Sequence, residues 1–319
     1  MTQNSSDLRF QHLHHWLQQH YHSSSFELTP ITNDASFRRY FRVTHQGQSA
    51  MAMDAPPAHE NLVTFIHKAQ IFHNLQIQVP KILAYNLDQG FLLMSDLGND
   101  LYLQIATSEN FAALYNLAIA TLQRIQTYVP QTAHALPDYD EALLLRELQL
   151  FPTWYLTQNN FSPDQDALDK IFKLLIDSAL KQPRVLVHRD YHSRNLLLLP
   201  HQQLGVVDFQ DAVIGPITYD LVSLLRDCYL AWPENAVENL VKQFYQDANL
   251  KNVATEEFLR WFDWMGLQRH LKVLGLFVRL HKRDQKPAYL KDLPRVLNYV
   301  RAISNKYSEF TVLQDLLAR

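Results

Sequence analysis

The sequence predicts an α+β protein with two lobes: a small lobe built on an antiparallel sheet, and a larger lobe that is mainly helical. Strand-like runs are concentrated in residues 1–95, whereas residues 96–319 show mostly the periodicity of helices. The chain has 319 residues, about twice the usual domain size, and 47% of them are apolar, which suffices for two cores. We therefore expect domains over 1–95 and 96–319.

The expected elements of the first lobe are short strands and amphipathic helices. In residues 7–22, Phe10, Leu13 and Leu17 recur at a spacing that places them on one face of a helix. A second helix with an apolar face is expected over 59–75. The strands of this lobe are expected at 36–43, 48–54, 80–85 and 90–94.

The second lobe has few strands and many helices. Residues 185–199 contain two apolar runs that enclose a polar segment, and another apolar strand is expected over 204–209. The expected helices are 110–128, 140–158, 163–181, 220–231, 235–247, 255–283 and 291–317.

Composition excludes several classes of protein. A net charge of -3 gives no indication of a nucleic-acid partner, and no run approaches the roughly 20 apolar residues of a membrane span. The N-terminus lacks the apolar segment of a signal peptide, and a single cysteine, Cys228, cannot form an internal disulfide. We expect a cytoplasmic protein, and nothing in the sequence implies a protein partner. Neither GxGxxG nor GxxxxGK[ST] occurs among the seven glycines, so the two common phosphate-binding loops are absent from the sequence.

The polar segment between the two apolar runs has the spacing of a kinase catalytic loop. It reads His188-Arg189-Asp190, then four residues, then Asn195. In such a loop the aspartate accepts a proton from the attacking hydroxyl and the asparagine holds a metal ion. Asp208 ends the next apolar strand, where a second metal ligand is expected. Carboxylate and amide oxygens suit Mg²⁺, so the pattern predicts phosphoryl transfer.

The segment after Asp208 indicates a small substrate. Asp220 follows only twelve positions after Asp208, which leaves no room for the long segment with which a protein kinase docks a peptide. Asp220 begins an expected helix. As an N-cap it would satisfy free backbone donors of that helix, and in kinase-like folds the matching aspartate also braces the catalytic loop; the two roles are compatible.

Three motifs resemble the aminoglycoside phosphotransferase and choline kinase superfamily. They are HRDYHSRN, DFQDAVIGPITYDL and LLMSDLG. TNDASFRRYFRV, MAMDAPP and the segment 264–300 are similar to one branch, the bacterial anomeric kinases of N-acetylmuramate and N-acetylglucosamine in peptidoglycan recycling. The resemblance implies a two-lobed protein-kinase-like fold, ATP with Mg²⁺, and phosphate transfer to the C1 hydroxyl of an amino sugar.

The resemblance also implies roles for single residues. Asp190 corresponds to the catalytic base, and Asn195 and Asp208 to the metal ligands. Asp211 stands where relatives keep a second acid. It is expected either to bind the metal or the substrate, or only to form a turn. The connector that meets adenine corresponds to Met94, Ser95 and Asp96, and the loop that donates to phosphate oxygens contains Asn33 and Ser36.

The strand lysine that holds the nucleotide phosphates in this superfamily is missing. Its slot falls on Met53 or Asp54, and Glu60 is the only acid available as the usual helix partner. Three arginines on the neighbouring strand offer compensation, with the first and third on one face and the second on the other. They are Arg38, Arg39 and Arg42. We expect one of them to replace the lysine.

The acceptor side of the site is less defined. The lactyl carboxylate of N-acetylmuramate favours a cation, and the candidates are Arg226, Arg269, Lys272 and Arg279. A kinase of another small alcohol, such as an aminoglycoside, choline or homoserine, is an alternative. So is a nucleotide-binding pseudokinase, because of the missing lysine. The sequence determines neither the preferred sugar nor the choice of ATP over GTP.

Overall fold

A computed structural model describes residues 7–31, 37–129 and 136–317. The chain forms two compact units. The first comprises Met1–Asn99 and Gly205–Gln210, and the second comprises Asp100–Leu204 and Asp211–Arg319. The short segment Gly205–Gln210 belongs to the first unit because Val206 donates its N–H to the carbonyl of Gln78 at 2.8 Å and Phe209 packs against Phe65 and Phe72. The expected domain limits of 1–95 and 96–319 stay a prediction.

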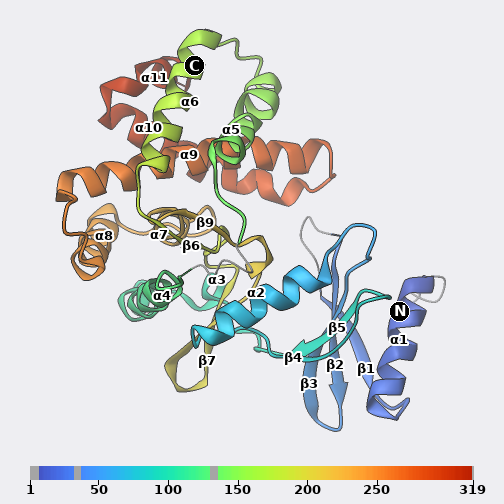
Figure 1. Cartoon of the computed structure of the whole chain (residues 1–319). Helices are drawn as coiled ribbons and strands as arrows, with labels where there is room; N and C mark the ends of the chain where they lie inside the picture. Colours follow the sequence, from blue (N-terminus) through green and yellow to red (C-terminus); the bar gives the residue numbers. More distant parts are fainter. Residues whose placement is uncertain (1–6, 32–36, 130–135, 318–319) are drawn as a thin grey trace. The chain divides into compact units, whose positions relative to one another are not determined.

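The first unit contains a five-stranded antiparallel sheet with strand order β1-β2-β3-β5-β4 (Figure 1). Its edge strand β1 was not predicted from the sequence, because Pro30 interrupts the strand pattern and four of its five residues are exposed. The elements of this unit are α1 (Leu8–Tyr21), β1 (Glu27–Ile31), β2 (Arg39–His45), β3 (Gln48–Asp54), α2 (Leu62–Asn74), β4 (Ile82–Asn86) and β5 (Phe91–Ser95).

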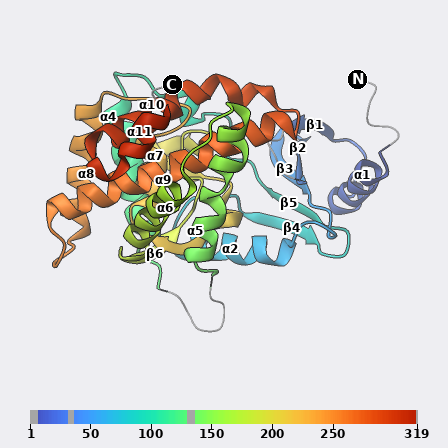
Figure 2. The ribbon, with the colours of Figure 1, turned by 90° about the horizontal axis from the view of Figure 1, so that it is seen from above.

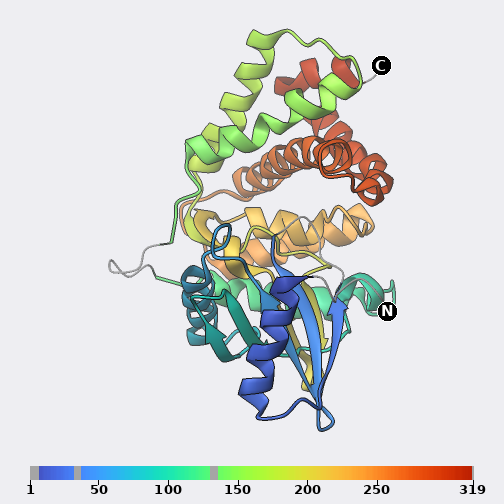
Figure 3. The same ribbon diagram turned by 90° about the vertical axis from the view of Figure 1, so that its right-hand side faces the viewer.

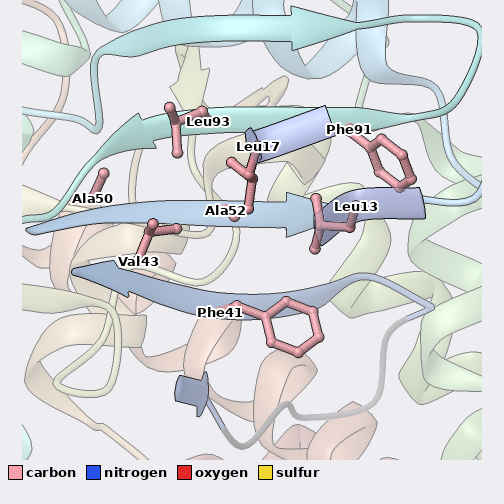
Figure 4. Packing of buried hydrophobic residues seen from close by; sticks show 8 residues of the cluster. All are labelled: Leu13, Leu17, Phe41, Val43, Ala50, Ala52, Phe91 and Leu93. Atoms are coloured by element: carbon pink, nitrogen blue, oxygen red, sulfur yellow. The ribbon is translucent and has the colours of Figure 1, made fainter. Parts of the chain in front are cut away.

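One face of this sheet is covered by α1. The helix begins at Asp7, whose carboxylate accepts the N–H groups of Arg9 and Phe10. Leu13 and Leu17 are fully buried, as their helical spacing predicts, and they pack on alternate residues of three strands. Those residues, shown with the two leucines in Figure 4, are Phe41, Val43, Ala50, Ala52, Phe91 and Leu93.

The second unit is organised around the long helix α9, which packs against α6, α7 and α10. Figure 2 shows α5, α6 and α10 alongside α9, and Figure 3 shows the same unit from the side. The helices are α3 (Tyr102–Ile105), α4 (Phe111–Ile125), α5 (Glu141–Leu148), α6 (Gln165–Leu180), α7 (Tyr219–Leu225), α8 (Glu234–Ala248), α9 (Thr255–Lys282), α10 (Leu293–Lys306) and α11 (Thr311–Leu317).

Short strands and turns complete the chain, and some of them include residues of the first-unit segment Gly205–Gln210. β6 pairs antiparallel with β9, and β7 pairs with β8, so the segment 188–195 runs between two strand ends. The remaining elements are β6 (Arg184–Val187), β7 (Leu196–Leu199), β8 (Gln203–Val206), β9 (Val213–Pro216), η2 (Phe151–Leu156), η3 (Pro200–Gln202), η4 (Phe209–Asp211), η5 (Pro287–Asp292) and η6 (Ser308–Phe310).

Two expected helices are divided in the structure. The segment 140–158 forms α5 and then the wider η2, which has Pro152 in its first turn, where its missing N–H is tolerated. Here the backbone comes so close to α9 that a Cβ at Gly275 would lie 2.0 Å from the carbonyl oxygen of Leu150. The segment 291–317 is divided at Tyr307, which has extended backbone angles. Among the described residues, no helix combines the length and apolar character needed to cross a membrane.

Candidate active site

The predicted catalytic loop brings Asp190 and Asn195 together. Asn195 donates its side-chain amide to the carbonyl oxygen of Asp190 at 2.9 Å, and its backbone N–H to the carbonyl of His192 at 2.9 Å. The flanking strands β6 and β7 hold both ends of the loop, as the two apolar runs indicated. The loop is therefore a fixed support for these two side chains.

Asp220 braces this loop from α7. Its carboxylate accepts the backbone N–H of His188 at 2.6 Å and that of Arg189 at 3.0 Å. Burial raises the pKa of Asp220 to about 7, although these two donors act in the opposite direction. Asp220 does not cap α7, because the N-cap residue is Thr218, so only the bracing half of that prediction is confirmed.

The brace is needed because Arg189 has an unfavourable backbone conformation. Its φ of 76° lies in the left-handed region, which costs a residue other than glycine about 1–3 kcal/mol. Asp220 fixes its N–H, and Arg269 donates to its carbonyl oxygen at 3.2 Å. This strain lies next to Asp190, the residue expected to face the acceptor.

Asp190 is held in its ionised form. Burial opposes ionisation, but His192, Lys272 and Arg269 act more strongly and lower the pKa of Asp190 to about 2. The side chain is 37% exposed, and its Oδ1 lies 3.9 Å from Nε2 of His192. A carboxylate in this setting can accept a hydrogen bond from a hydroxyl at any physiological pH.

Glu147 pairs with Lys272 and Arg189, and it was missed in the sequence. It is 5% exposed, and it accepts hydrogen bonds from Nζ of Lys272 at 2.8 Å, from the Arg189 guanidinium and from the Tyr139 hydroxyl. Burial raises the pKa of Glu147, but the two cations lower it further than burial raises it. A signal was present, since Glu147 lies on the apolar stripe that Leu144 and Leu148 form on α5.

We expect Glu147→Gln to destabilise the protein by about 3–5 kcal/mol, because it leaves Arg189 and Lys272 buried without their counter-charge. Urea denaturation of the variant and of wild type measures the difference. Glu238→Gln is the control. Its carboxylate is exposed and lies 3.9 Å from Lys242 on the same helix, so we expect a loss below about 0.5 kcal/mol. A similar loss in both variants would contradict a special role for Glu147.

Asp208 lies in the first unit, on a strained turn after β8. Its φ is 67°, and its exposed carboxylate accepts a hydrogen bond from the side-chain amide of Gln210 at 2.7 Å. Lys68, a buried residue of α2, donates to the carbonyl oxygen of Gln210 at 2.5 Å. Lys68 thus positions the segment that carries Asp208. It was also missed, although it lies beside apolar residues on the buried face of its helix.

The three arginines offered in place of the missing lysine have different partners. Arg38 forms an ion pair with Glu60, with Nε and Oε1 separated by 3.5 Å. Arg39 binds Asp7 and Asp54 on the face covered by α1, in agreement with the predicted alternation. Of the three, Arg38 is the one paired with Glu60, the acid that the sequence offered as the partner of the missing lysine.

Tyr40 links this ion pair to Asp208. Burial raises the pKa of Tyr40, Arg38 lowers it, and the nearby carboxylates of Asp208 and Glu60 raise it again. Arg38, Glu60 and Asp208 therefore all lie near one half-buried tyrosine. Met53, in the slot of the missing lysine, is fully buried and opposite Tyr40 in the sheet.

The residues of the expected connector lie at the end of β5, and the carboxylate of Asp96 already has partners there. Met94 is buried in β5, opposite Met51. Asp96 accepts hydrogen bonds from Arg42 at 2.6 and 3.1 Å, from the Ser49 hydroxyl and from the N–H of Gly98. A contact between nucleotide and this segment would therefore use its backbone. Asn33 and Ser36 lie outside the described residues.

The remaining candidates are distributed over the second unit. Asp211 is exposed at the end of η4. Arg226 is 4% exposed and binds Glu234 and Asp263 at 2.8 Å each, so its charge is already used within the fold. Arg269 is also buried and donates to the Tyr219 hydroxyl at 3.2 Å. The acceptor roles of these three residues stay predictions.

The oxygen donors expected at the metal site are of the type that Mg²⁺ requires. The side-chain nitrogen of Asn195 faces Asp190, so the amide oxygen is directed elsewhere, and Asp208 is an exposed carboxylate. Among the ranges that the structure describes, no group of three or more His, Cys, Asp or Glu side chains could hold a metal ion. Mg²⁺ bound together with phosphates needs only one or two carboxylates.

Most of the chain is similar in sequence to known kinases. Residues 27–262 match the phosphotransferase enzyme family. The N-acetylmuramate/N-acetylglucosamine kinase of Pseudomonas putida is 44% identical over 299 residues, which cover 91% of this chain and 87% of that protein. The kinase of the same name from Pseudomonas aeruginosa is 42% identical and covers 98% of this chain and 97% of its own length.

Solved structures show the same fold at low identity. A choline kinase from Streptococcus pneumoniae has a TM-score of 0.64 at 11% identity, with 91% of this chain and 99% of that chain covered. An ADP-bound aminoglycoside phosphotransferase, APH(2'')-Ib, has a TM-score of 0.61 at 14% identity, with 92% and 98% covered. The predicted two-lobed protein-kinase-like α+β fold is confirmed.

Proposed function

The chain belongs to the phosphotransferase enzyme family, and from this premise we propose that it transfers a phosphate from ATP to the C1 hydroxyl of N-acetylmuramate, N-acetylglucosamine or both, in peptidoglycan recycling. The observation that carries the reaction type is the ionised Asp190 on its braced loop. The choice of acceptor is supported by relatives of that name at 44% and 42% identity. We further propose a cytoplasmic location, and no nucleic-acid, membrane or protein partner.

In the proposed reaction Asp190 orients the C1 hydroxyl for attack on the terminal phosphate. A carboxyl with a pKa of about 2 is a weak base, so its main contribution is to hold the hydroxyl and to receive its proton late in the reaction. Asn195 and Asp208 are the proposed Mg²⁺ ligands. When bound, that ion neutralises charge on the phosphates. Met94 and Asp96 belong to the proposed adenine-binding segment.

The test of this proposal uses an acceptor panel. Protein, MgATP and each sugar are incubated, and the product is examined by phosphorus NMR, in which a C1 phosphate couples to the anomeric proton. We expect a C1 phosphate from at least one of the two amino sugars. Consumption of ATP only with an aminoglycoside, choline or homoserine would replace the proposed acceptor. If no acceptor led to consumption of ATP, a pseudokinase would be favoured. The same assay with GTP in place of ATP tests which nucleotide is the phosphate donor.

Arg38 is the proposed substitute for the missing strand lysine, because it is paired with Glu60 and lies near the ring that Asp208 also approaches. We expect Arg38→Ala to raise the KM for ATP by about 10- to 100-fold, since a hydrogen bond from a charged group contributes about 1.5–3 kcal/mol. Steady-state kinetics with varied ATP measures this, and the KM for the sugar serves as the internal reference.

Arg39→Ala is the matched control. This neighbouring arginine binds Asp7 and Asp54 instead, so its removal should lower stability and leave the KM for ATP nearly unchanged. An unchanged KM for ATP in Arg38→Ala and also in Arg42→Ala would show that no arginine of this strand replaces the lysine.

A further inference from the structure

A second buried carboxylate holds the catalytic loop on the far side of Asp190. Asp227 is 1% exposed and directly follows the C-terminal end of α7. Its Oδ2 accepts the backbone N–H of Ser193 at 2.9 Å. Asp220, in the first turn of the same helix, accepts the N–H groups of the two residues before Asp190. The two carboxylates therefore hold the loop before and after the residue expected to face the acceptor.

The contact with Asp227 fixes the backbone of the loop rather than a side chain. Ser193 is fully buried, and its hydroxyl has no hydrogen-bond partner among the described residues. Both of its backbone groups are engaged, because its N–H is donated to Asp227 and its carbonyl oxygen accepts the N–H of Leu103 in α3 at 3.0 Å. A buried N–H that lost its acceptor would cost about 1–3 kcal/mol, so the chain would have to move.

Asp227 is itself held in place. Its Oδ1 accepts the N–H of Tyr229, two residues further on, at 2.8 Å, which closes a turn at the end of α7. The carbonyl oxygens of the residues before and after Asp227 accept hydrogen bonds from His270 at 2.9 Å and from Arg295 at 2.8 Å. Both carboxylate oxygens are therefore in use, and the backbone that carries them is fixed by α9 and α10.

The part of the loop that Asp227 holds leads directly to Asn195. Asn195 donates its backbone N–H to the carbonyl oxygen of His192 at 2.9 Å, which closes a turn with Ser193 as its first central residue. The side-chain nitrogen of Asn195 donates to the carbonyl of Asp190, and its amide oxygen is the atom proposed to bind Mg²⁺. Because Asp227 places Ser193, it also places this turn and the side chain at its end.

We propose that Asp227 is a positioning residue for Asn195, so that the catalytic loop is supported in two parts. Asp220 places the part with Asp190, and Asp227 places the part with the proposed Mg²⁺ ligand. This proposal rests on the proposed function, because the role of Asn195 as a ligand belongs to that function. Groups that orient a metal ligand without touching the metal typically contribute about 10- to 100-fold to metal affinity or activity.

The kinetic test compares one variant in each part of this support. We expect Asp227→Asn to raise the free Mg²⁺ concentration for half-maximal turnover by about 10- to 100-fold at saturating ATP and sugar. The amide keeps one acceptor oxygen but directs an N–H₂ group at a backbone donor. Asp220→Asn should instead lower kcat and leave the Mg²⁺ requirement nearly unchanged.

Two further variants separate position from charge and from substitution as such. Asp227→Glu keeps the negative charge but displaces the carboxylate, so it should also raise the Mg²⁺ requirement. Asp164→Asn is the matched control, because Asp164 likewise accepts two backbone N–H groups, at the exposed start of α6. Asparagine caps helices as well as aspartate does, so this variant should keep the wild-type stability and Mg²⁺ requirement.

Two measurements need no turnover. Calorimetry gives the affinity for ADP with and without Mg²⁺, and the gain from Mg²⁺ should be about 10- to 100-fold smaller in Asp227→Asn than in wild type. Hydrogen exchange, followed by mass spectrometry with fragmentation, reports the Ser193 amide. We expect slow exchange in wild type and in Asp164→Asn, and faster exchange in Asp227→Asn.

Several outcomes would overturn the proposal. An equal rise in the Mg²⁺ requirement of Asp227→Asn and Asp220→Asn would mean that the loop is held as one body. A lower melting temperature with an unchanged Mg²⁺ requirement would leave Asp227 only a structural role, and a wild-type requirement in Asp227→Glu would mean that its charge acts rather than its position.

The design also covers a variant that does not fold and a wrong acceptor. If Asp227→Asn did not fold, Asp227→Glu would take its place in the comparison, and rapid exchange of the Ser193 amide in wild type would by itself refute the contact. An absence of turnover with both amino sugars would refute the proposed function. The ADP affinities and the exchange rates would then still decide the role of Asp227.

Discussion

Asp190→Asn should lower kcat by about 10²- to 10⁴-fold, which is the contribution of a positioned proton acceptor. The amide has nearly the shape of the carboxylate, but it carries no charge and offers only one oxygen to the acceptor hydroxyl. The carboxyl of Asp190 has a pKa of about 2, so wild type should show no acid limb from this group between about pH 5 and 8. Initial rates over that range, with saturating ATP and sugar, measure both effects.

Folding of the Asp190→Asn variant is checked separately. Its circular dichroism spectrum and its KM for ATP should resemble those of wild type, because the loop is held by Asp220 and Glu147 rather than by Asp190. Asp177→Asn, at a half-exposed residue paired with Lys173 on α6, is the control for an aspartate substitution as such. A variant that retained half of the wild-type turnover would rule out Asp190 as the residue that readies the acceptor.

Asp208→Asn should abolish the Mg²⁺-dependent part of turnover. A metal ion contributes several kcal/mol to the stability of the charged transition state, which corresponds to a loss of about 10³-fold or more. Asp208 is exposed, and its backbone strain is already present in the fold, so we expect the variant to fold normally. The measurement is kcat as a function of Mg²⁺ concentration at saturating ATP.

The comparison variant for this prediction is Asp211→Asn. Asp211 is exposed three residues further along, and the sequence left open whether it binds metal, binds substrate or only forms a turn. A loss in Asp208→Asn alone assigns the metal role to Asp208. An Mg²⁺ dependence that is unaltered in Asp208→Asn would exclude that residue as a ligand.

Much of the fold was predictable because its signals are local. The apolar stripe of α1, the alternation in β2 and β3 and the apolar runs around residues 188–195 each follow from the geometry of one element. The errors arose where packing overrides local pattern. β1 is an exposed edge strand that depends on β2, and the predicted helix 140–158 changes to η2 where its backbone meets Gly275 of α9.

The family, the fold class and the spacing of Asp190, Asn195 and Asp208 follow from the sequence, because these are properties of short segments. The pairing of each charge, in contrast, depends on the folded chain. Glu147 meets Arg189 and Lys272 from 42 and 125 residues away, and among 32 acids and 29 basic residues no local pattern selects those partners. The same holds for Arg38 and Arg39, since only the folded chain places one beside Glu60 and the other beside Asp54. Ion pairs act through space, so the fold assigns them after the sequence has supplied the residues.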